Sequence, residues 1–364
     1  MKFKILKSEL DKHISIAQKA ISNKSSIQLL EGILFTVKDG QLILSSTDLE
    51  LSIETRVDCD VIDEGSIVIN SAMIGNLVRK MPQDMITITV DGVNINIKSQ
   101  NSVFDITGQE ANEYPQNPDI HEEVLLTMEN QDLKDAIKET IFATSNDETR
   151  LAFTGVLFEI KEDYVRFVGL DGYRMAMKTF EINSESQATS IVPKRAFNEL
   201  IKILDDTSTD IIVIPGHIVF INGSTKMYSR LIDKNYIDYN KIIIKRHKTT
   251  VKLNRNDFIN SLERALLLTT GNNASLTKLS FEDDMISINS NSEFGKLDEK
   301  IYVEKEGDDL LIAFNTRYML DGLKAIEDDE IVLHLNSQLE PMNIFPVNDS
   351  NQYIYIVLPV RLSK

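Results

Sequence analysis

Acidic pairs and scattered histidines are the residues of this sequence whose side chains could carry out chemistry. Asp58 and Asp60 flank the single cysteine, Cys59, and Asp–Asp pairs begin at positions 205, 283, 308 and 328. Paired carboxylates can hold a metal ion or share acid–base catalysis. Each of the four Asp–Asp pairs sits where a turn is expected, and solvated turn residues explain the acidic pairs better than a catalytic site does.

Other catalytic and metal-binding signatures are missing from the sequence. The five histidines, at positions 13, 121, 217, 247 and 334, include no pair at metal-ligand spacing, and a single cysteine argues against a zinc site. No G-x-x-x-x-G-K-[ST], G-x-G-x-x-G or G-x-S-x-G motif occurs, so these phosphate-binding loops and the nucleophile elbow are absent. The sequence therefore predicts a non-catalytic protein with no metal and no cofactor.

Composition narrows the class of protein further. The chain has 364 residues, of which 42% are hydrophobic, which is enough for two or three packed domains and too many for a disordered chain. One cysteine excludes a disulfide scaffold. No run approaches the ~20 apolar residues of a membrane helix, and the start MKFKILKSEL lacks a signal-peptide core. We therefore expect a soluble, cytoplasmic protein.

The elements that would position these side chains repeat three times. Amphipathic helical segments begin near Ser8, Asn130 and Asn256, each after a strand-like run. In register, apolar or small residues coincide at helical spacing: Leu10, Leu133 and Phe258, then Ile14, Ile137 and Leu262, then Ala17, Thr140 and Ala265. The offsets of 123 and 125 residues between the first three positions are the size of a domain.

Each repeat also contains a second helix and several alternating strands. The second helices are expected at 71–81, 193–204 and 315–326, and VDGV at 90–93 and IPGH at 214–217 predict hairpins. We predict an α+β fold of three copies of one domain, in which two helices pack on antiparallel sheets. The predicted domains are residues 1–120, 121–245 and 246–364.

The charge of the chain is distributed unevenly between these elements. The net charge of −17 taken alone opposes nucleic-acid binding through bulk charge. The six expected helices, at 8–22, 71–81, 130–143, 193–204, 256–268 and 315–326, hold twelve basic and nine acidic residues, so they are +3 and the remainder is −20. Either lysine and arginine simply favour helices, or a helical surface faces an anionic partner.

Several motifs resemble one known family along the whole chain. They are MKFKI at the start, TDLE at 47–50, GVLFE at 155–159, DGYRMA at 171–176, IVPKRAFNEL at 191–200, IDYNKII at 237–243, FNTRYMLDGL at 314–323 and the C-terminal YIVLPVRL. In this order, on a threefold repeat, they resemble the bacterial DNA polymerase III β subunit family, the sliding clamps. The resemblance implies half of a closed ring, formed by a head-to-tail homodimer around duplex DNA, that tethers a polymerase without catalysing a reaction.

A helix-lined ring of this kind is large enough for DNA. Two chains would supply twelve helices, and at ~10 Å spacing these make a circle about 38 Å across their axes. Subtracting about 5 Å of helix radius on each side leaves an opening near 28 Å, wide enough for a hydrated duplex. The resemblance implies these partners: double-stranded DNA held without regard to sequence, the DNA polymerase III catalytic subunit, the clamp-loader complex and other replication and repair proteins.

The resemblance also assigns residues to DNA. The DNA-binding candidates are Lys24, Arg79, Arg150, Lys194, Arg195, Lys202 and Arg264. For each of them, the alternative is a solvated surface cation with no partner.

A docking cleft and a ring interface follow from the same resemblance. The cleft, for a peptide roughly of the QLxLF kind, would use Phe153, Leu170, Gly172, Tyr173, Arg174, Met175, Ile237, Ile242, Pro341, Ile356 and Leu358. Ile237 stands where the family usually has proline, and Leu170 where a small hydroxyl residue is frequent. The ring interface would join Phe104 and Ile106 of one chain to Leu267 and Leu268 of the other.

Two other classes of protein compete with the clamp. One is an enzyme whose site is assembled from the acidic pairs, although the sequence offers it neither nucleophile nor base. The other is a repeat scaffold that binds proteins but not DNA. Retention on nicked circular DNA, lost when the DNA is linearised, separates a clamp from a scaffold.

Overall fold

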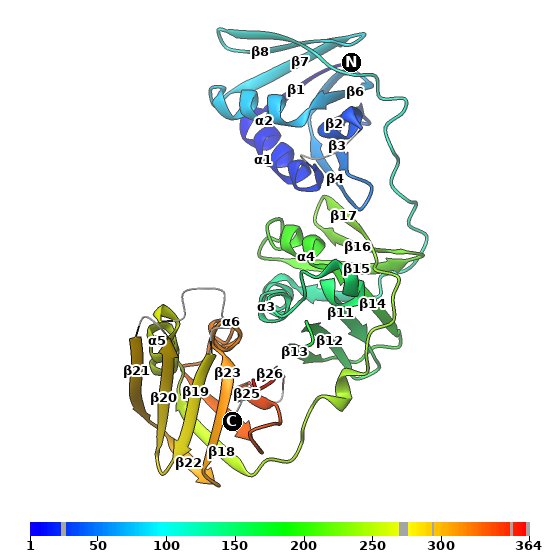
Figure 1. Cartoon of the computed structure of the whole chain (residues 1–364). Coiled ribbons are helices and arrows are strands. Elements are labelled where there is room, and N and C mark those ends of the chain that lie inside the picture. Colours follow the sequence, from blue (N-terminus) through cyan, green and yellow to red (C-terminus); the bar gives the residue numbers. More distant parts are fainter. Residues whose placement is uncertain (23–26, 269–275, 293–294, 350–351, 362–364) are drawn as a thin grey trace. The chain divides into compact units, whose positions relative to one another are not determined.

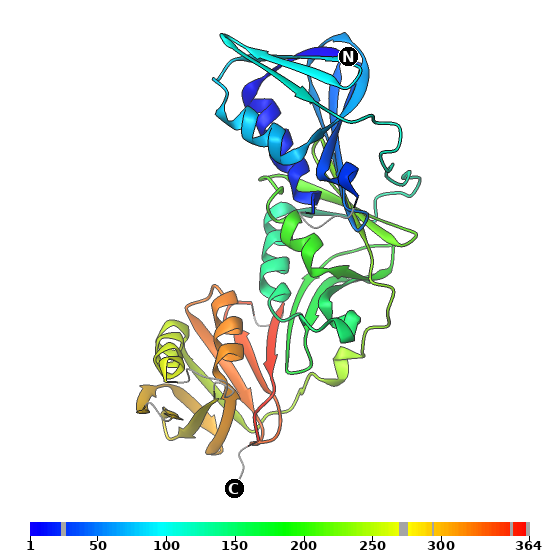
Figure 2. The same cartoon turned by 45° about the horizontal axis from the view of Figure 1, so that its top comes forward.

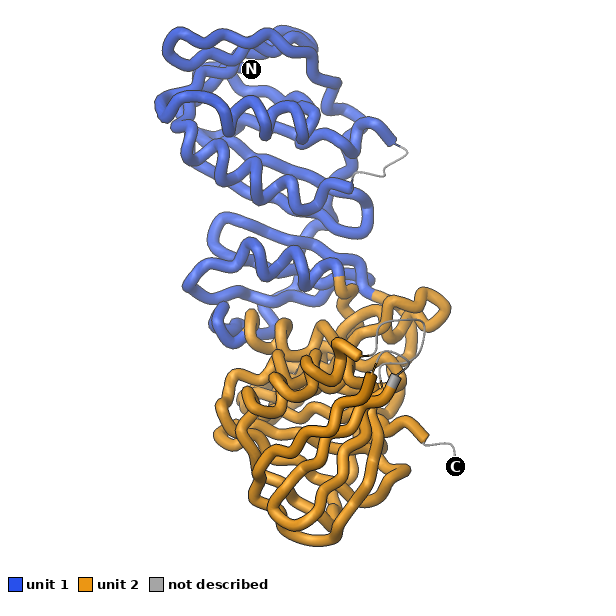
Figure 3. The backbone as a smooth tube through the Cα atoms, turned by 60° about the vertical axis from the view of Figure 1, so that its left-hand side comes forward, with its two compact units in different colours: residues 1–132, 195–231 blue, residues 133–194, 232–364 orange. Residues whose placement is uncertain are grey.

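The chain divides into two compact units, which Figure 3 draws in different colours. The computed structural model describes residues 1–22, 27–268, 276–292, 295–349 and 352–361. Unit 1 comprises residues 1–132 and 195–231, and unit 2 comprises residues 133–194 and 232–364. Each unit contains two antiparallel sheets with helices packed on them, so the predicted α+β architecture is confirmed.

Unit 1 holds a five-stranded and an eight-stranded sheet, and Figure 1 labels most of their strands. The smaller sheet has the order β5 (Asp60–Asp63), β1 (Lys2–Leu6), β7 (Met85–Asp91), β8 (Asn94–Ser99), β9 (Ser102–Thr107). The larger has the order β10 (Leu126–Glu129), β15 (Ser208–Ile214), β16 (His217–Asn222), β17 (Thr225–Arg230), β4 (Leu51–Asp58), β3 (Gln41–Thr47), β2 (Gly32–Lys38), β6 (Gly65–Asn70). Both predicted hairpins are present, as β7–β8 and β15–β16.

Unit 2 holds a nine-stranded and a four-stranded sheet. The larger has the order β14 (Ala188–Pro193), β11 (Gly155–Ile160), β12 (Tyr164–Leu170), β13 (Arg174–Glu181), β26 (Tyr353–Val357), β25 (Met342–Pro346), β24 (Glu330–Leu335), β18 (Thr249–Asn254), β22 (Glu304–Gly307). The smaller has the order β21 (Gly295–Tyr302), β20 (Met285–Ser292), β19 (Leu276–Glu282), β23 (Leu310–Asn315).

The described part of the chain contains six α-helices, one at each of the six predicted places. They are α1 (Lys7–Ala17), α2 (Ser71–Lys80), α3 (Asn130–Ile141), α4 (Lys194–Leu200), α5 (Arg255–Leu267) and α6 (Thr316–Ala325), with short 3₁₀ helices η1 (Gln18–Ala20), η2 (Gln28–Glu31), η3 (Glu148–Thr154) and η4 (Tyr239–Lys241). Figures 1 and 2 show α1 beside α2 in unit 1, and α5 beside α6 in unit 2.

Asparagine side chains begin three of these helices. Asn70, Asn254 and Asn315 each accept a hydrogen bond from a backbone N–H in the first turn of α2, α5 and α6. Two helices begin slightly earlier than the sequence predicted: α1 starts at Lys7, one residue before Ser8, and the α5 cap lies two residues before Asn256. With these bounds the helices still hold twelve basic and nine acidic residues.

The positions that align between the three repeats are positions of the hydrophobic core. All nine aligned positions are fully buried: Leu10, Leu133, Phe258, Ile14, Ile137, Leu262, Ala17, Thr140 and Ala265. Thr140 is the one hydroxyl among them, and its Oγ1 donates to the carbonyl of Ala136 at 2.6 Å, so burial leaves no polar group unpaired. Helical spacing therefore marked the core-facing side of all three first helices.

The two compact units do not follow the three repeats. The middle repeat contributes β10, β15, β16 and β17 to unit 1, and β11 to β14 to unit 2. Strand pairing across repeats accounts for this, since β17 pairs with β4 and β13 pairs with β26. Among the described residues, no helix is both long enough and apolar enough to cross a membrane.

Candidate functional site

Three residues expected in the docking cleft form a continuous row across unit 2. Leu170 ends β12 and pairs with Met175 on β13, which in turn pairs with Ile356 on β26. Directly paired residues of antiparallel strands project to the same face of a sheet. All three side chains are 1% exposed and belong to one apolar cluster, so they form a floor rather than an open surface.

Exposed apolar side chains surround this floor. Tyr173 is 57% exposed, Ile237 43% and Leu358 37%, and the backbone N–H of Leu358 donates to the carbonyl of Tyr173 at 2.9 Å. The half-buried Phe153 and Ile242 pack against the same apolar cluster, and Pro341 is half-buried just before β25. Mostly apolar surfaces of this kind are typical of ligand-binding pockets.

A cavity of about 490 Å³ lies beside Phe153 and Ile237. It is bounded by η3 and by the segment that leads to Ile237, with the lining Glu148, Thr149, Arg150, Leu151, Ala152, Phe153, Lys234, Asn235 and Ile237. Tyr236 fixes this segment, since its hydroxyl donates to the carbonyl of Val168 at 3.1 Å and its ring meets that of Phe153 edge-on at 6.0 Å. Burial raises the pKa of Tyr236, which keeps the hydroxyl protonated as a donor.

The DGYR turn positions Tyr173 and Arg174. Asp171 Oδ1 accepts from the backbone N–H groups of Tyr173, at 2.8 Å, and Arg174, at 3.1 Å. Gly172, which lies between Asp171 and Tyr173, has a φ of +92°, a conformation that favours glycine. A Cβ at Gly172 would meet Nη1 of Arg150 at 3.2 Å, so Arg150 lies against this turn.

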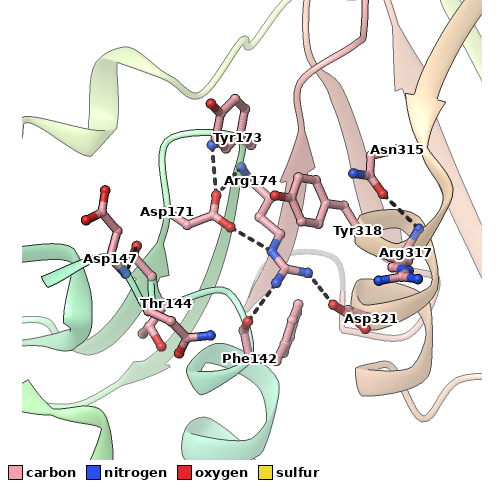
Figure 4. A network of polar contacts seen from close by, with 12 residues as sticks. Phe142, Thr144, Asp147, Asp171, Tyr173, Arg174, Asn315, Arg317, Tyr318 and Asp321 are labelled. Atoms are coloured by element: carbon pink, nitrogen blue, oxygen red, sulfur yellow. Dashed lines mark hydrogen bonds and ion pairs between the residues drawn. The ribbon is translucent and has the colours of Figure 1, made fainter. Parts of the chain in front are cut away.

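Arg174 is engaged by protein groups on every side, as Figure 4 shows. Its Nε donates to Asp171 at 3.1 Å, its Nη1 to Asp321 of α6 at 2.6 Å, and its Nη2 to the carbonyl of Phe142 at 3.0 Å. The guanidinium carbon lies 4.4 Å from the ring centroid of Tyr318, and the side chain is only 9% exposed. Arg174 therefore holds the DGYR turn in place instead of offering a free charge to a ligand.

Sequence reasoning missed the residues that hold Arg174. Asp321 and Tyr318 lie in the clamp-like motif FNTRYMLDGL, but no local sequence pattern links them to a side chain in β13. Tyr318 also stacks with Tyr173, with ring centroids 6.1 Å apart. Their place in this motif was the one sequence signal that marked Asp321 and Tyr318 as functional residues. It did not indicate that they contact Arg174.

The acidic pairs do not assemble into a site. They lie at the ends of elements, as turn residues do; Asp283, for example, has a positive φ between β19 and β20. Asp205 accepts from Thr207, Asn222 and Asn130, and these hydrogen bonds lower its pKa to about 2. Within the described ranges, no three histidine, cysteine or acidic residues gather as they would around a metal ion.

Comparison with known proteins assigns the whole chain to one family. Models of the N-terminal, central and C-terminal domains of the DNA polymerase III beta subunit match residues 1–118, 127–238 and 240–361. A beta sliding clamp from Bacillus subtilis is 31% identical over 99% of this chain and 100% of its own length. The chain belongs to the DNA polymerase III beta subunit family, the beta sliding clamps. It is a non-catalytic subunit that confers processivity on DNA polymerase III.

Further comparisons agree with this membership. A beta sliding clamp from Halalkalibacterium halodurans is also 31% identical, over 99% of this chain and all of its own length. The crystal structure of the Bacillus subtilis sliding clamp superposes with a TM-score of 0.96 at 31% identity, with both chains fully covered. The clamp fold with three domains is therefore shown at the level of sequence and of structure.

The DNA-binding candidates of this clamp differ in how much charge they have available. Arg195 pairs with Asp48, Lys202 with Glu199 at 2.8 Å, and Arg264 with Glu299, through Nε at 2.9 Å. Arg79 and Lys194 reach only amide oxygens, of Asn76 and Asn146, each at 3.4 Å. Lys24 lies outside the described residues. In the part of the chain that the structure describes, Arg79, Arg150 and Lys194 form no ion pair with a carboxylate. A carboxylate partner reduces the field that a phosphate feels, so these three candidates differ from Arg195, Lys202 and Arg264.

The expected interface residues lie on edges of sheets or ends of helices. Phe104 is 41% exposed on β9, an edge strand of unit 1, and Ile106 on the same strand is half-buried against the core. Leu267, the last residue of α5 in unit 2, is 74% exposed, and Leu268 after it is half-buried. Phe104 and Leu267 are thus the two candidates that present apolar surface outward.

Proposed function

We propose that two chains join head to tail into a ring that encircles duplex DNA without regard to sequence. Edge strands with exposed apolar residues support this, because isolated proteins usually protect such edges. β9, with Phe104, is the edge of the five-stranded sheet, and β21 is the edge of the four-stranded sheet on which α5 packs. Pairing these edges between two chains would cover Phe104 and Leu267 together.

The distribution of charge supports DNA inside such a ring. The six helices are +3 in a chain of −17, so a helix-lined opening is the least repulsive surface for phosphates. A weakly positive lining also permits sliding, since dense cationic contacts would bind the backbone tightly. We expect the ring to act on DNA in the cytoplasm. The clamp-loader complex and the polymerase catalytic subunit are its expected partners there.

We further propose that partner proteins dock by a short peptide in the cleft of unit 2. The single observation that carries this is the row of Leu170, Met175 and Ile356, bordered by the exposed Tyr173, Ile237 and Leu358. The two atypical residues, Leu170 and Ile237, make the floor and the rim apolar. Both therefore favour a leucine- and phenylalanine-containing peptide of the QLxLF kind.

Topological retention on DNA tests the ring directly. The chain is loaded onto nicked circular DNA with the clamp-loader complex and ATP, and the DNA is separated by gel filtration before and after linearisation. We expect the chain to travel with circular DNA and to be lost from linear DNA. Equal retention on both, or none on either, would contradict the ring and favour a protein scaffold.

A further inference from the structure

The segment that follows the docking cleft carries a run of cations in a strongly acidic protein. Lys241, Lys245, Arg246 and Lys248, here called the connector patch, are all exposed. No acidic residue occurs between positions 241 and 248, whereas the chain as a whole holds 56 acidic and 39 basic residues. The connector patch is therefore a local reversal of the charge of the molecule.

The backbone of the connector patch is fixed. Asn343, which is 3% exposed, donates from Nδ2 to the carbonyl of Ile244 at 3.0 Å, and the N–H of Lys248 donates to the carbonyl of Leu335 at 3.0 Å. Between them, the ring of His247 stacks on that of His334 with centroids 3.7 Å apart. Anchored donors lose less backbone entropy when a ligand binds than donors on a flexible loop do.

Most of the charge of the connector patch is unpaired. Lys241 makes an exposed ion pair with Asp238 at 3.2 Å. Lys245, Arg246 and Lys248 have no carboxylate within ion-pair distance among the described residues, although β22 brings Glu306 alongside Thr250. Three exposed cations held close together without partners repel one another, and an acidic ligand relieves that repulsion.

The connector patch is continuous with the docking cleft. Lys241 lies in the sequence between Ile237, which lines the cavity of about 490 Å³, and Ile242, which packs on the apolar cluster of the cleft floor. Lys245 to Lys248 follow directly. An extended peptide advances about 3.3 Å per residue, so four residues beyond a docked motif would cover about 13 Å.

We propose that the connector patch binds acidic residues next to the docking motif of a partner protein. Since this rests on the docking cleft proposed above, the cleft selects the apolar motif and the connector patch selects its flank. A peptide fits better than a nucleic acid because the cations continue an apolar peptide cleft along a single extended segment. Exposed ion pairs each change affinity by about 1.5- to 5-fold, so three of them predict about a tenfold preference, screened by salt.

Labelled peptides with different flanks test this on the full chain. The peptides share the core Gln-Leu-Ser-Leu-Phe and carry four glutamates on the amino side, four glutamates on the carboxyl side, or four glutamines on both. Their dissociation constants are measured by fluorescence anisotropy at 50 mM and 500 mM NaCl. We expect one glutamate peptide to bind about tenfold more tightly than the glutamine peptide at 50 mM, and equally at 500 mM.

A matched pair of variants separates the connector patch from net charge. The triple variant Lys245→Gln, Arg246→Gln, Lys248→Gln should abolish the preference and leave the glutamine peptide unchanged. The control Lys4→Gln, Lys12→Gln, Lys38→Gln removes three exposed cations from unit 1 and should keep the preference. A preference within twofold of unity in the parent chain, or one that survives the connector variant, would overturn the inference.

Two further outcomes have distinct meanings. If none of the peptides binds, the proposal of a docking cleft is wrong, and so is the role of the connector patch. If all peptides bind equally well, only the role of the connector patch is wrong. A labelled dT20 oligonucleotide is measured in parallel. If it binds the parent chain and loses at least fivefold in affinity in the connector variant, while the peptides show no preference, the patch contacts nucleic acid and the inference is wrong.

Discussion

Arg174 and Asp321 lie 147 positions apart in the chain, and their guanidinium and carboxylate meet at 2.6 Å. The first belongs to the DGYR motif of the middle domain and the second to α6 of the third domain, both within unit 2. With Asp171 and the carbonyl of Phe142 as further acceptors, this contact ties the turn that carries Tyr173 to the third domain.

Replacing Arg174 should destabilise the fold. Arg174→Met removes the charged partner of Asp171 and Asp321 and one donor to the carbonyl of Phe142. Breaking such a network costs about 2–3 kcal/mol when one carboxylate, here Asp321, is half exposed. Urea unfolding measures the loss. Lys241→Met, which breaks an exposed pair with Asp238, serves as control and should stay within about 0.5 kcal/mol. Equal stability of both variants would contradict the importance of Arg174.

Gly322→Ala should destabilise the protein although glycine is a poor helix former. In α6 a Cβ at this position would lie 2.1 Å from the ring of the buried Tyr355. We expect the clash to outweigh the ~1 kcal/mol that alanine contributes in a helix, with a net loss of about 1–3 kcal/mol.

Gly75→Ala in α2 is the matched helical control. There a Cβ meets the amide nitrogen of Gln18, the far end of a flexible side chain, at 2.3 Å. Thermal unfolding of the two variants should therefore differ, with Gly75→Ala close to the parent. A Gly322→Ala protein more stable than the parent would show that Tyr355 can move aside.

The folded state should lose stability as the pH decreases, because of the titration of His334. Burial, followed by the charge of His247, lowers the pKa of His334 to about 4. Between pH 6.5 and 4 the unfolded chain therefore binds a proton that the folded chain excludes, and the folded state loses stability as the pH decreases. After allowance for solvent screening of the half-buried ring, the loss at pH 5 is about 1 kcal/mol.

His334→Phe tests this assignment. The variant removes the titrating ring, so its free energy of unfolding should decrease less than that of the parent between pH 7 and pH 5. Urea titrations at the two pH values give the change in the free energy of unfolding for each protein, and the two changes are then compared. Parallel losses in parent and variant would mean that other groups cause the pH dependence.

An acidic substitution on the rim should abolish peptide docking. Ile237→Asp places a charge at a 43% exposed position beside the cavity, where the leucine and phenylalanine of a QLxLF-type peptide would bury apolar surface, and we expect at least a tenfold loss of affinity. Met175 suits the test less well, because at 1% exposure a charge there would unfold the cluster.

Ile62→Asp controls for the rim substitution. Ile62 is 49% exposed on β5 of unit 1, so the same chemical change is made away from the cleft residues. Fluorescence anisotropy with the glutamine-flanked peptide should give parental affinity for this variant. Unchanged affinity in Ile237→Asp would place the peptide elsewhere.

The proposed ring interface predicts a loss of dimers when Leu267 becomes charged. Leu267→Asp alters a 74% exposed residue, so the fold should be retained while the apolar contact is lost. Mass photometry at nanomolar concentration should find monomers for the variant and dimers for the parent. Dimers of the variant at the same concentration would exclude this end of α5 from the interface.

The sequence alone determined what depends on local spacing. The register of Leu10, Leu133 and Phe258 identified three repeats and the buried faces of their helices, because an amphipathic helix must bury the same face wherever it packs. The hairpins at Gly92 and Gly216 followed from turn chemistry that needs only adjacent residues. The clamp motifs, spread from end to end, then agreed with the family that the comparisons confirm.

Only the tertiary structure decided which distant residues meet. Nothing near Arg174 in the sequence points to Asp321, and nothing near Arg264 points to Glu299 on β21. The pairing of β13 with β26 and of β17 with β4 likewise divides the middle repeat between two compact units. Such contacts depend on how whole sheets join, and the free energy of joining sheets comes from surfaces assembled by many segments, so no single motif encodes it.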